Sequence, residues 1–257
     1  LKKNNLNVRI KDLSNWNMNQ VWGKRPKLLD DNFKEFNLSK VICKNCEWIR
    51  LNLIGANLKG ANLQRTQFRQ VKLQNAKLEN AILRKARFYE SKLIGANLKG
   101  AELYDSFFEN TNLQRANLQG AKLGGTIFSQ GTDLCDTNLE NANLNNAVLP
   151  GAKLERANLK GATLKKTNLR KANLMKANLE NANLEGAKLR GAYLAKANLG
   201  LADSTGADLK GAILEGADLG GSNLQGADLE EADLKGAILE EAWLEGANLG
   251  AAKLQRA

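Results

Sequence analysis

The sequence predicts an all-β solenoid in which very short strands stack in coils of twenty residues. Three observations predict it: a five-residue repeat through nearly all of the 257 residues, aromatic repeat centres twenty residues apart, and glycine at a fixed place after many centres. A period of five fits neither the 3.6-residue period of a helix face nor the two-residue period of a strand face. The period therefore has to arise from the packing of whole repeats.

The centre of each repeat is a large apolar residue, nearly always leucine. From Leu134 to Leu254 the frame passes through 25 centres, all of them leucine except Ser204. The residue two positions before each of these centres is always Ala, Ser or Thr. At two positions in every five the size of the side chain is thus nearly constant, large at the centre and small two residues before it. This regularity indicates a packing constraint. One extra residue interrupts the frame within residues 129–133, where we expect a bulge at a corner.

The aromatic centres recur with a longer period than the repeat. Trp48, Phe68, Phe88, Phe108 and Phe128 are each twenty residues from the next. If four repeats make one coil, every twentieth residue falls in one column, and successive rings lie about one strand separation, ~4.8 Å, apart. We expect these five residues to form a core column along the axis of the solenoid.

Glycine or asparagine often stands two positions after a centre, as at Gly55, Gly60, Asn75 and Asn80. The third residue of a type II turn has a positive φ, which glycine and asparagine tolerate. Each repeat is then a very short strand followed by a turn. Many copies carry Lys, Arg or Glu in this slot instead, so we expect the turn type to vary along the chain.

The motif of a small residue, Asn or Asp, Leu or Phe and two variable residues, as in "ANLKGANLQ" from Ala56, resembles the pentapeptide-repeat family over nearly the whole chain. The resemblance implies a right-handed quadrilateral parallel β-helix with four repeats per coil, here about 12 coils. Residues 31–257 are expected to form a single β-helix. Residues 1–30 are expected to hold degenerate repeats or a cap.

The composition argues against catalysis and metal binding, because the chain has no histidine and only three cysteines. Cys43 is a repeat centre and Cys46 the next small position, so we expect small core residues and not a zinc or redox pair. Glu230 and Glu231 fall in outward slots, which is typical of a solvated face. The hydroxyl of Ser204 is expected to bond nearby backbone. We expect no enzyme activity and no cofactor.

Apolar side chains in the slot before a centre mark a candidate interaction surface, since this slot is usually polar. They are Phe107, Ile127 and Val148, on successive coils of one face if the insertion preserves the face order, the pair Tyr193 and Ile213, and Trp243 alone. The alternative is that long neighbouring side chains partly cover them.

The net charge of +11 is unevenly distributed. Residues 200–257 contain 11 acidic and 4 basic residues, or −7, which leaves 34 basic and 16 acidic residues, or +18, in residues 1–199. The densest basic cluster comprises Lys165, Lys166, Arg170 and Lys171, at adjoining corners. An anionic membrane surface is therefore a candidate partner of the basic part.

Three classes of function follow. The family resemblance implies binding of DNA gyrase or another topoisomerase by an acidic mimic of duplex DNA, which the charge of +11 disfavours. Non-specific nucleic-acid binding is disfavoured because acidic residues interleave with the basic ones. We favour a non-catalytic rigid scaffold or protein–protein interaction module, part of a larger or membrane-associated assembly, as the family's long forms in photosynthetic bacteria suggest.

The partner, the oligomeric state and the compartment stay open. No run of about 18 apolar residues occurs, so we expect a soluble domain, with any membrane tether in segments outside this chain. The C-terminal "LGAAKLQRA" is still in frame without a cap, which makes the chain resemble the repeat region of a larger protein and allows end-to-end stacking.

Overall fold

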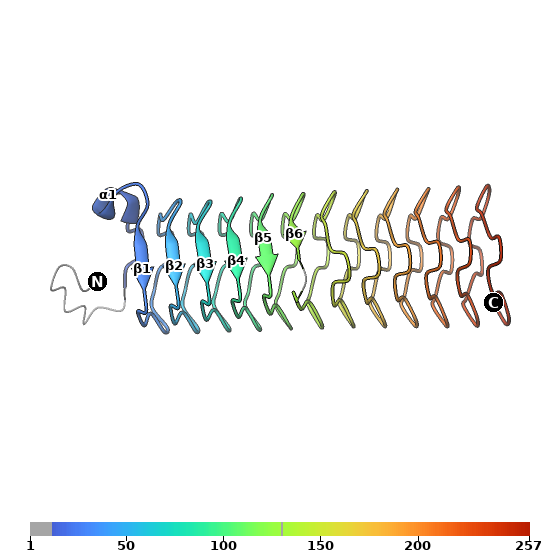
Figure 1. Ribbon diagram of the computed structural model, residues 1–257, viewed down its shortest axis with the longest axis horizontal. Helices are drawn as coiled ribbons and strands as arrows, with labels where there is room; N and C mark the ends of the chain where they lie inside the picture. Colours follow the sequence, from blue (N-terminus) through green and yellow to red (C-terminus); the bar gives the residue numbers. More distant parts are fainter. Residues whose placement is uncertain (1–11, 130) are drawn as a thin grey trace.

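The structure, a computed structural model, describes residues 12–129 and 131–257 and shows a straight four-sided rod (Figure 1). Parallel bridges join residues twenty apart on each side of a coil, as in Asn57 with Lys77 and Asn62 with Ile82. Such bridges recur along the rod as far as the pair Asp233 and Lys253. The predicted fold class, a parallel β-helix with four repeats per coil, is therefore confirmed. The count of about 12 coils stays a prediction.

One side of the rod carries the regular strands. They are β1 (Lys27–Leu29), β2 (Glu47–Ile49), β3 (Gln67–Arg69), β4 (Arg87–Tyr89), β5 (Phe107–Glu109) and β6 (Ile127–Phe128). They form one parallel sheet in sequence order, with each strand paired to the strand twenty residues on. We call this side, with its continuation through Val148, Asn168, Lys188 and Asp208, the strand side.

The extra residue is absorbed within one corner. The bridge from Asn112 runs to Asp133 and that from Ile127 to Val148, a step of 21 residues, and from Asp133 the next bridge runs to Lys153, a step of twenty. All four sides therefore keep their order past the insertion.

Repeat centres and small residues fill the interior, where most are fully buried. The rings of Phe68, Phe88, Phe108 and Phe128 stack with centroids 4.4, 4.6 and 4.9 Å apart and interplanar angles below 10°. Trp48 instead meets the edge of Phe68 at 82°. The column therefore consists of parallel rings along the four phenylalanines and ends edge-on at Trp48.

The corners keep a positive φ whatever residue occupies them, and the predicted variation in turn type is present between sides of the rod. The N–H of Ala61 donates to the Leu58 carbonyl across one corner at 3.0 Å, whereas the described corners that follow the aromatic centres Trp48, Phe68, Phe88 and Phe108 lack this bond. Arg65 and Lys85 both have a φ of 58°, close to the 65° of Gly60. The N–H of each donates to a carbonyl of the next coil, at 2.9 Å for Arg65 and Lys85. This bond between coils holds the left-handed backbone against a steric cost of roughly 1–2 kcal/mol per residue.

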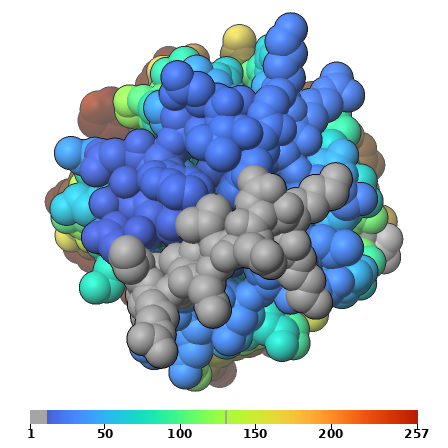
Figure 2. All heavy atoms as spheres, turned by 90° about the vertical axis from the view of Figure 1, so that its left-hand side faces the viewer, coloured from blue at the N-terminus to red at the C-terminus, as the bar shows by residue number. Residues whose placement is uncertain are grey.

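The N-terminal end departs from the repeat. Helix α1 (Met18–Trp22) begins after Asn17, whose side chain accepts a hydrogen bond from the Gln20 N–H. Asn17 bridges Ile42, a step of 25 residues, and Gly23, which the frame counts as a centre, caps the helix. Figure 2 shows the described N-terminal residues lying across this end of the rod. Residues 1–11 of the predicted N-terminal segment lie outside the described residues.

Candidate interaction surface

The apolar stripe predicted from the sequence lies on the strand side. Phe107 in β5 pairs with Ile127 in β6, and Ile127 bridges Val148 on the following coil. Each of the three occupies the outward slot before a buried centre. Ile127 is 41% exposed, while Phe107 and Val148 are half-buried. The insertion leaves the three on one side of the rod, because it shifts all four sides by the same residue.

An aromatic side chain that the sequence analysis missed extends this stripe. Tyr89, at the end of β4, lies 5.8 Å from Phe107 between ring centroids. The guanidinium of Arg69 lies 4.9 Å from the centroid of the Tyr89 ring, a favourable cation–π distance. Tyr89 stands in the slot after a centre, whereas the surface residues predicted from the sequence all stand in the slot before one. Arg69 and Tyr89 are twenty residues apart in the sequence, and this spacing indicates that they lie side by side on neighbouring coils.

Two further aliphatic residues occupy the same slot on the N-terminal coils. Leu29 at the end of β1 is 46% exposed, and Ile49 at the end of β2 is half-buried beside it in the sheet register. The strand side thus presents apolar side chains on most coils from Leu29 to Val148. Exposed cationic residues Arg69 and Arg87 lie among them.

The other predicted surface residues lie on different sides. Tyr193 and Ile213 bridge each other, with Tyr193 45% exposed and Ile213 half-buried. Trp243 is 63% exposed and lies on another side of the rod, where it bridges Asn223 of the previous coil. The structure therefore does not bring the six predicted residues together. Only Phe107, Ile127 and Val148 form a continuous stripe.

The basic cluster is partly neutralised by neighbouring coils. The ammonium of Lys165 lies 2.6 Å from the carboxylate of Glu185, and the hydrogen bond raises the pKa of Lys165. Arg170 approaches Asp208 only to 3.8 Å. Within the described part of the chain, Lys166 and Lys171 have no carboxylate at ion-pair distance.

Opposite charges often occupy the same slot on successive coils. Such pairs at a twenty-residue spacing are Arg50 with Asp30, Lys122 with Glu102, Arg156 with Asp136, Lys160 with Glu180 and Lys210 with Glu230. Glu230 lies 2.5 Å from the Lys210 ammonium, so it is an ion-pair partner on the surface.

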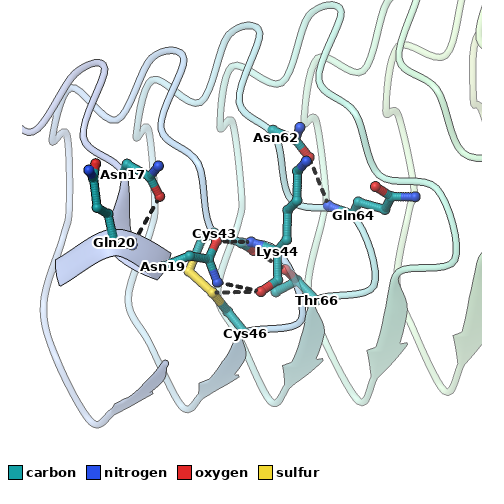
Figure 3. The surroundings of a disulfide bond; sticks show 9 residues. All are labelled: Asn17, Asn19, Gln20, Cys43, Lys44, Cys46, Asn62, Gln64 and Thr66. Atoms are coloured by element: carbon teal, nitrogen blue, oxygen red, sulfur yellow. Dashed lines mark hydrogen bonds between the residues drawn. A yellow bond between two sulfur atoms is a disulfide. The ribbon is translucent and has the colours of Figure 1, made fainter. Parts of the chain in front are cut away.

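The cysteines differ from the sequence prediction in one respect. Cys43 and Cys46 are fully buried, as expected, but they form a disulfide across a single corner (Figure 3). The repeat pattern predicts that both side chains point inward, but it does not show that two inward side chains of one corner touch. The Asn19 side chain from α1 donates to the Lys44 carbonyl and accepts from the Lys44 N–H, both at 2.7 Å. The disulfide corner is thus also the docking point of α1.

The third cysteine, Cys135, is a half-buried free thiol. Burial raises the pKa of the Cys135 thiol to about 11, and neighbouring Asp133 adds to the shift. A thiol with so high a pKa is a weak nucleophile at neutral pH. Among the residues that the structure describes, no three His, Cys, Asp or Glu side chains gather as metal ligands would.

Ser204 corrects a second expectation. It is fully buried as a repeat centre, yet its hydroxyl has no hydrogen-bond partner among the described residues. The hydroxyl of Ser222, also buried, is likewise unpartnered within residues 12–129 and 131–257. Elsewhere a buried hydroxyl reaches a carbonyl one coil away, as Thr167 reaches Leu144 at 2.7 Å. Ser222 stands in the same small slot as Thr167, so the slot alone does not decide whether a buried hydroxyl is hydrogen-bonded.

The sequence matches known repeat families over most of its length. The model named Pentapeptide repeats matches residues 32–70, 130–165, 152–191, 187–226 and 212–250, and the model named Pentapeptide repeat region matches residues 61–133. None of the curated proteins compared with the chain matches it. No helix in the described part of the chain has the length and apolar character to span a membrane.

Several solved structures resemble the chain. HetL, a pentapeptide repeat protein involved in heterocyst differentiation regulation from the cyanobacterium Nostoc sp. strain PCC 7120, is 33% identical, with 91% of this chain and 94% of HetL covered and a TM-score of 0.44. A pentapeptide repeat protein from the Arabidopsis thaliana thylakoid lumen is 31% identical, covering 44% of this chain and 70% of that one, with a TM-score of 0.23. QnrB1, a plasmid-mediated fluoroquinolone resistance protein, is 16% identical, with 76% and 91% covered and a TM-score of 0.36.

Proposed function

The chain belongs to the pentapeptide-repeat family, and on that premise we propose that it is a non-catalytic rigid scaffold that binds a protein partner along its strand side. The observation that carries the proposal is the stripe Phe107, Ile127 and Val148, in a slot that is polar on most other coils. Contiguous exposed apolar area usually marks an interaction site.

The partner that suits this side is an apolar segment flanked by acidic side chains. The apolar residues supply the centre of a contact, where burial contributes most to affinity. Arg87 and Arg69 are exposed beside them, and Arg87 has no ion-pair partner within the described residues. Carboxylates on the partner would find these cations at the edge of the contact, which favours orientation and association rate.

The rigidity of the rod supports a scaffold function. Every coil is joined to the next by backbone hydrogen bonds on all four sides, and the interior is filled by centres and small residues. A partner bound at one coil is therefore held at a fixed distance from a partner bound at another. Membership of a larger or membrane-associated assembly is part of the proposal, with the basic residues suited to an anionic membrane surface.

Mimicry of duplex DNA fits the surface less well. A DNA mimic presents rows of carboxylates, while this chain has a net charge of +11 and pairs many of its carboxylates with cations on the next coil. Non-specific nucleic-acid binding is the second alternative. Its test is retention of labelled duplex DNA at low and high salt, with loss of binding at high salt as the expected signature.

The proposal is tested by affinity purification with the chain as bait, comparing the wild type with the Phe107→Asp and Ile127→Asp double variant. Two carboxylates in the stripe would have to be desolvated on binding, so the captured partner should be lost. A partner that the double variant retains at the wild-type level would contradict the assignment of the strand side.

A matched control is available on a different side of the rod. Asn178→Asp with Asn198→Asp adds the same two negative charges in the same slot. The side-chain oxygen of each Asn accepts a backbone N–H two residues on, and Asp218 in the same column accepts the corresponding bond. This control variant carries the same kind of repulsion between carboxylates on neighbouring coils as the test variant and should keep the partner.

A further inference from the structure

We propose that one corner of the rod carries a binding site for a phosphoryl group, presented by a small phosphorylated molecule or by a lipid headgroup. The site is a hollow of about 240 Å³ on three successive coils, which we call the basic groove. Its lining is Arg170, Lys171, Arg190, Gly191, Lys210, Gly211 and Glu231. It lies beyond the apolar stripe, further toward the C-terminus, and shares no residue with it, while its lipid-headgroup form deepens the proposed membrane association.

The charges that line the groove do not alternate in sign from coil to coil. At several other positions, a cation on one coil faces a carboxylate in the same slot on the next. Here Arg170, Arg190 and Lys210 occupy one slot on three consecutive coils, placed in register by the bridges along the strand side. Strand separation puts neighbouring members of this column about 4.8 Å apart at the backbone. Like charges directly opposite each other destabilise a sheet, so an anion bound between them would reduce the repulsion between the cations.

The carboxylates of the fold compensate this column only in part. Lys210 lies 2.5 Å from Glu230 and 3.9 Å from Glu231. Arg170 reaches a carboxylate only at 3.8 Å, and Arg190 has none at ion-pair distance in the described part of the chain. The lining of the groove therefore contains four cationic residues and one acidic residue. The middle arginine of the column, Arg190, is not neutralised by an ion pair within the described part of the chain.

Glycine makes room for a ligand beside the column. The corner slot holds Lys171 on the first coil, then Gly191 and Gly211 on the next two. A Cβ at Gly211 would meet no atom within 4 Å, and one at Gly191 would meet only the Lys171 side chain at 3.7 Å. The missing side chains leave the hollow open at the guanidinium groups. Arginine binds phosphoryl oxygens through two parallel N–H donors, and an adjacent lysine adds a point charge, which suits a multiply charged oxyanion.

A second run of cations supplies the matched control. Arg156, Lys176 and Lys196 share a corner slot on three successive coils of the next side of the rod. Arg156 is already held by two hydrogen bonds to Asp136, and these residues are not part of the lining of the basic groove. Removing two charges from this run changes the net charge of the chain as much as removing two from the groove.

The test is isothermal titration of the 257-residue chain with inorganic phosphate, inorganic pyrophosphate and acetate. We expect saturable binding of phosphate or pyrophosphate that is at least about tenfold weaker in Arg170→Gln with Arg190→Gln. Lys176→Gln with Lys196→Gln should bind as the wild type does. Gly211→Asn keeps every charge and suits a left-handed corner, yet it fills the hollow, so it should also weaken binding.

The source of the phosphoryl group is separated by sedimentation with phosphatidic acid vesicles. Vesicle binding that depends on Arg170 and Arg190 identifies a lipid headgroup, and binding of soluble pyrophosphate alone identifies a small molecule; either supports the site. Absence of binding to all phosphoryl probes at low salt would overturn it. Equal weakening by the groove and control pairs, or acetate binding as tight as that of pyrophosphate, would show a general positive field and overturn it as well.

Discussion

The ring of Phe88 lies parallel to the ring of Phe108, with centroids 4.6 Å apart and planes 2° from parallel. Phe88 makes the same kind of contact with Phe68, at 4.4 Å. Each ring in the middle of the column therefore shares both faces with other rings, and the twenty-residue period of the sequence is the period of this stack. Aromatic pairs contribute about 0.5–1.5 kcal/mol each beyond the area that they bury.

Replacing Phe88 with leucine should lower the free energy of unfolding by about 1–3 kcal/mol, because both stacking contacts are lost while a large apolar side chain remains. Phe88→Ala should cost about 3–5 kcal/mol. Leu83→Ala, on the preceding side of the same coil, is the control for cavity formation without stacking. Urea unfolding followed by circular dichroism measures all three variants. A leucine variant as stable as the wild type would show that ring stacking contributes nothing.

Ser204→Leu should stabilise the rod by about 1–3 kcal/mol. The bridges place Ser204 between Leu184 and Leu224 in one column of centres, and its hydroxyl is buried and unpartnered within the described residues. Leucine fills the same slot on the neighbouring coils and carries no polar atom. The melting temperature is the measurement, with Ser222→Ala as a variant that removes an unpartnered hydroxyl at almost constant volume. A lower melting temperature for Ser204→Leu would mean that the column narrows at this coil.

Corner substitutions should have opposite effects at Gly120 and Lys85. Both have a positive φ, of 62° and 58°, and a Cβ at Gly120 would meet no atom within 4 Å. Gly120→Ala should therefore cost roughly 1–2 kcal/mol from backbone strain alone, and Lys85→Gly should relieve a strain of the same origin. The larger entropy of glycine in the unfolded chain offsets part of that gain. Chemical denaturation measures the free energy of unfolding of the two variants. Destabilisation of equal size in both would contradict the prediction that backbone strain at the corner sets the sign of the effect.

The ion pairs of Glu102 should make stability depend on pH. The hydrogen bond from Lys122 lowers the pKa of Glu102, against an opposing effect of burial, and Arg84 lowers it further. A carboxyl whose pKa is lower in the folded state stabilises the fold above its unfolded pKa, near 4.5, and this contribution is lost as the pH falls through the folded value. Glu102→Gln should cost about 1 kcal/mol or less at neutral pH, with a difference from the wild type that shrinks below pH 4.5. A difference that grows toward acid pH would have the wrong sign.

The repeat in the sequence was sufficient to predict the architecture. Because residues twenty apart fall in one column, the sequence alone places Phe68 next to Phe88. A single inserted residue does not change the order of the sides, because hydrogen bonds to the next coil close each corner. The face of Phe107, Ile127 and Val148 was predictable for the same reason. In a solenoid, position in the frame sets position in space.

Contacts between different slots were not predictable in this way. The Tyr89 ring reaches Phe107 because two side chains in different slots lean toward each other across neighbouring coils, and slot assignment alone does not give their direction. The disulfide of Cys43 with Cys46 likewise depends on side chains converging inside one corner. The positive φ at Lys85 was missed for another reason: hydrogen bonds between coils override the local preference of the residue.

The most direct test of the account places a photo-crosslinking amino acid, p-benzoylphenylalanine, at position 127 in one variant and at position 178 in another. Ile127 lies in the apolar stripe, and Asn178 occupies the same slot on a different side of the rod. Irradiation in the native cells should give one crosslinked protein species from position 127 and none of that species from position 178. Equal crosslinking from both positions, or crosslinking from position 178 alone, would contradict the claim that the strand side is the partner-binding surface.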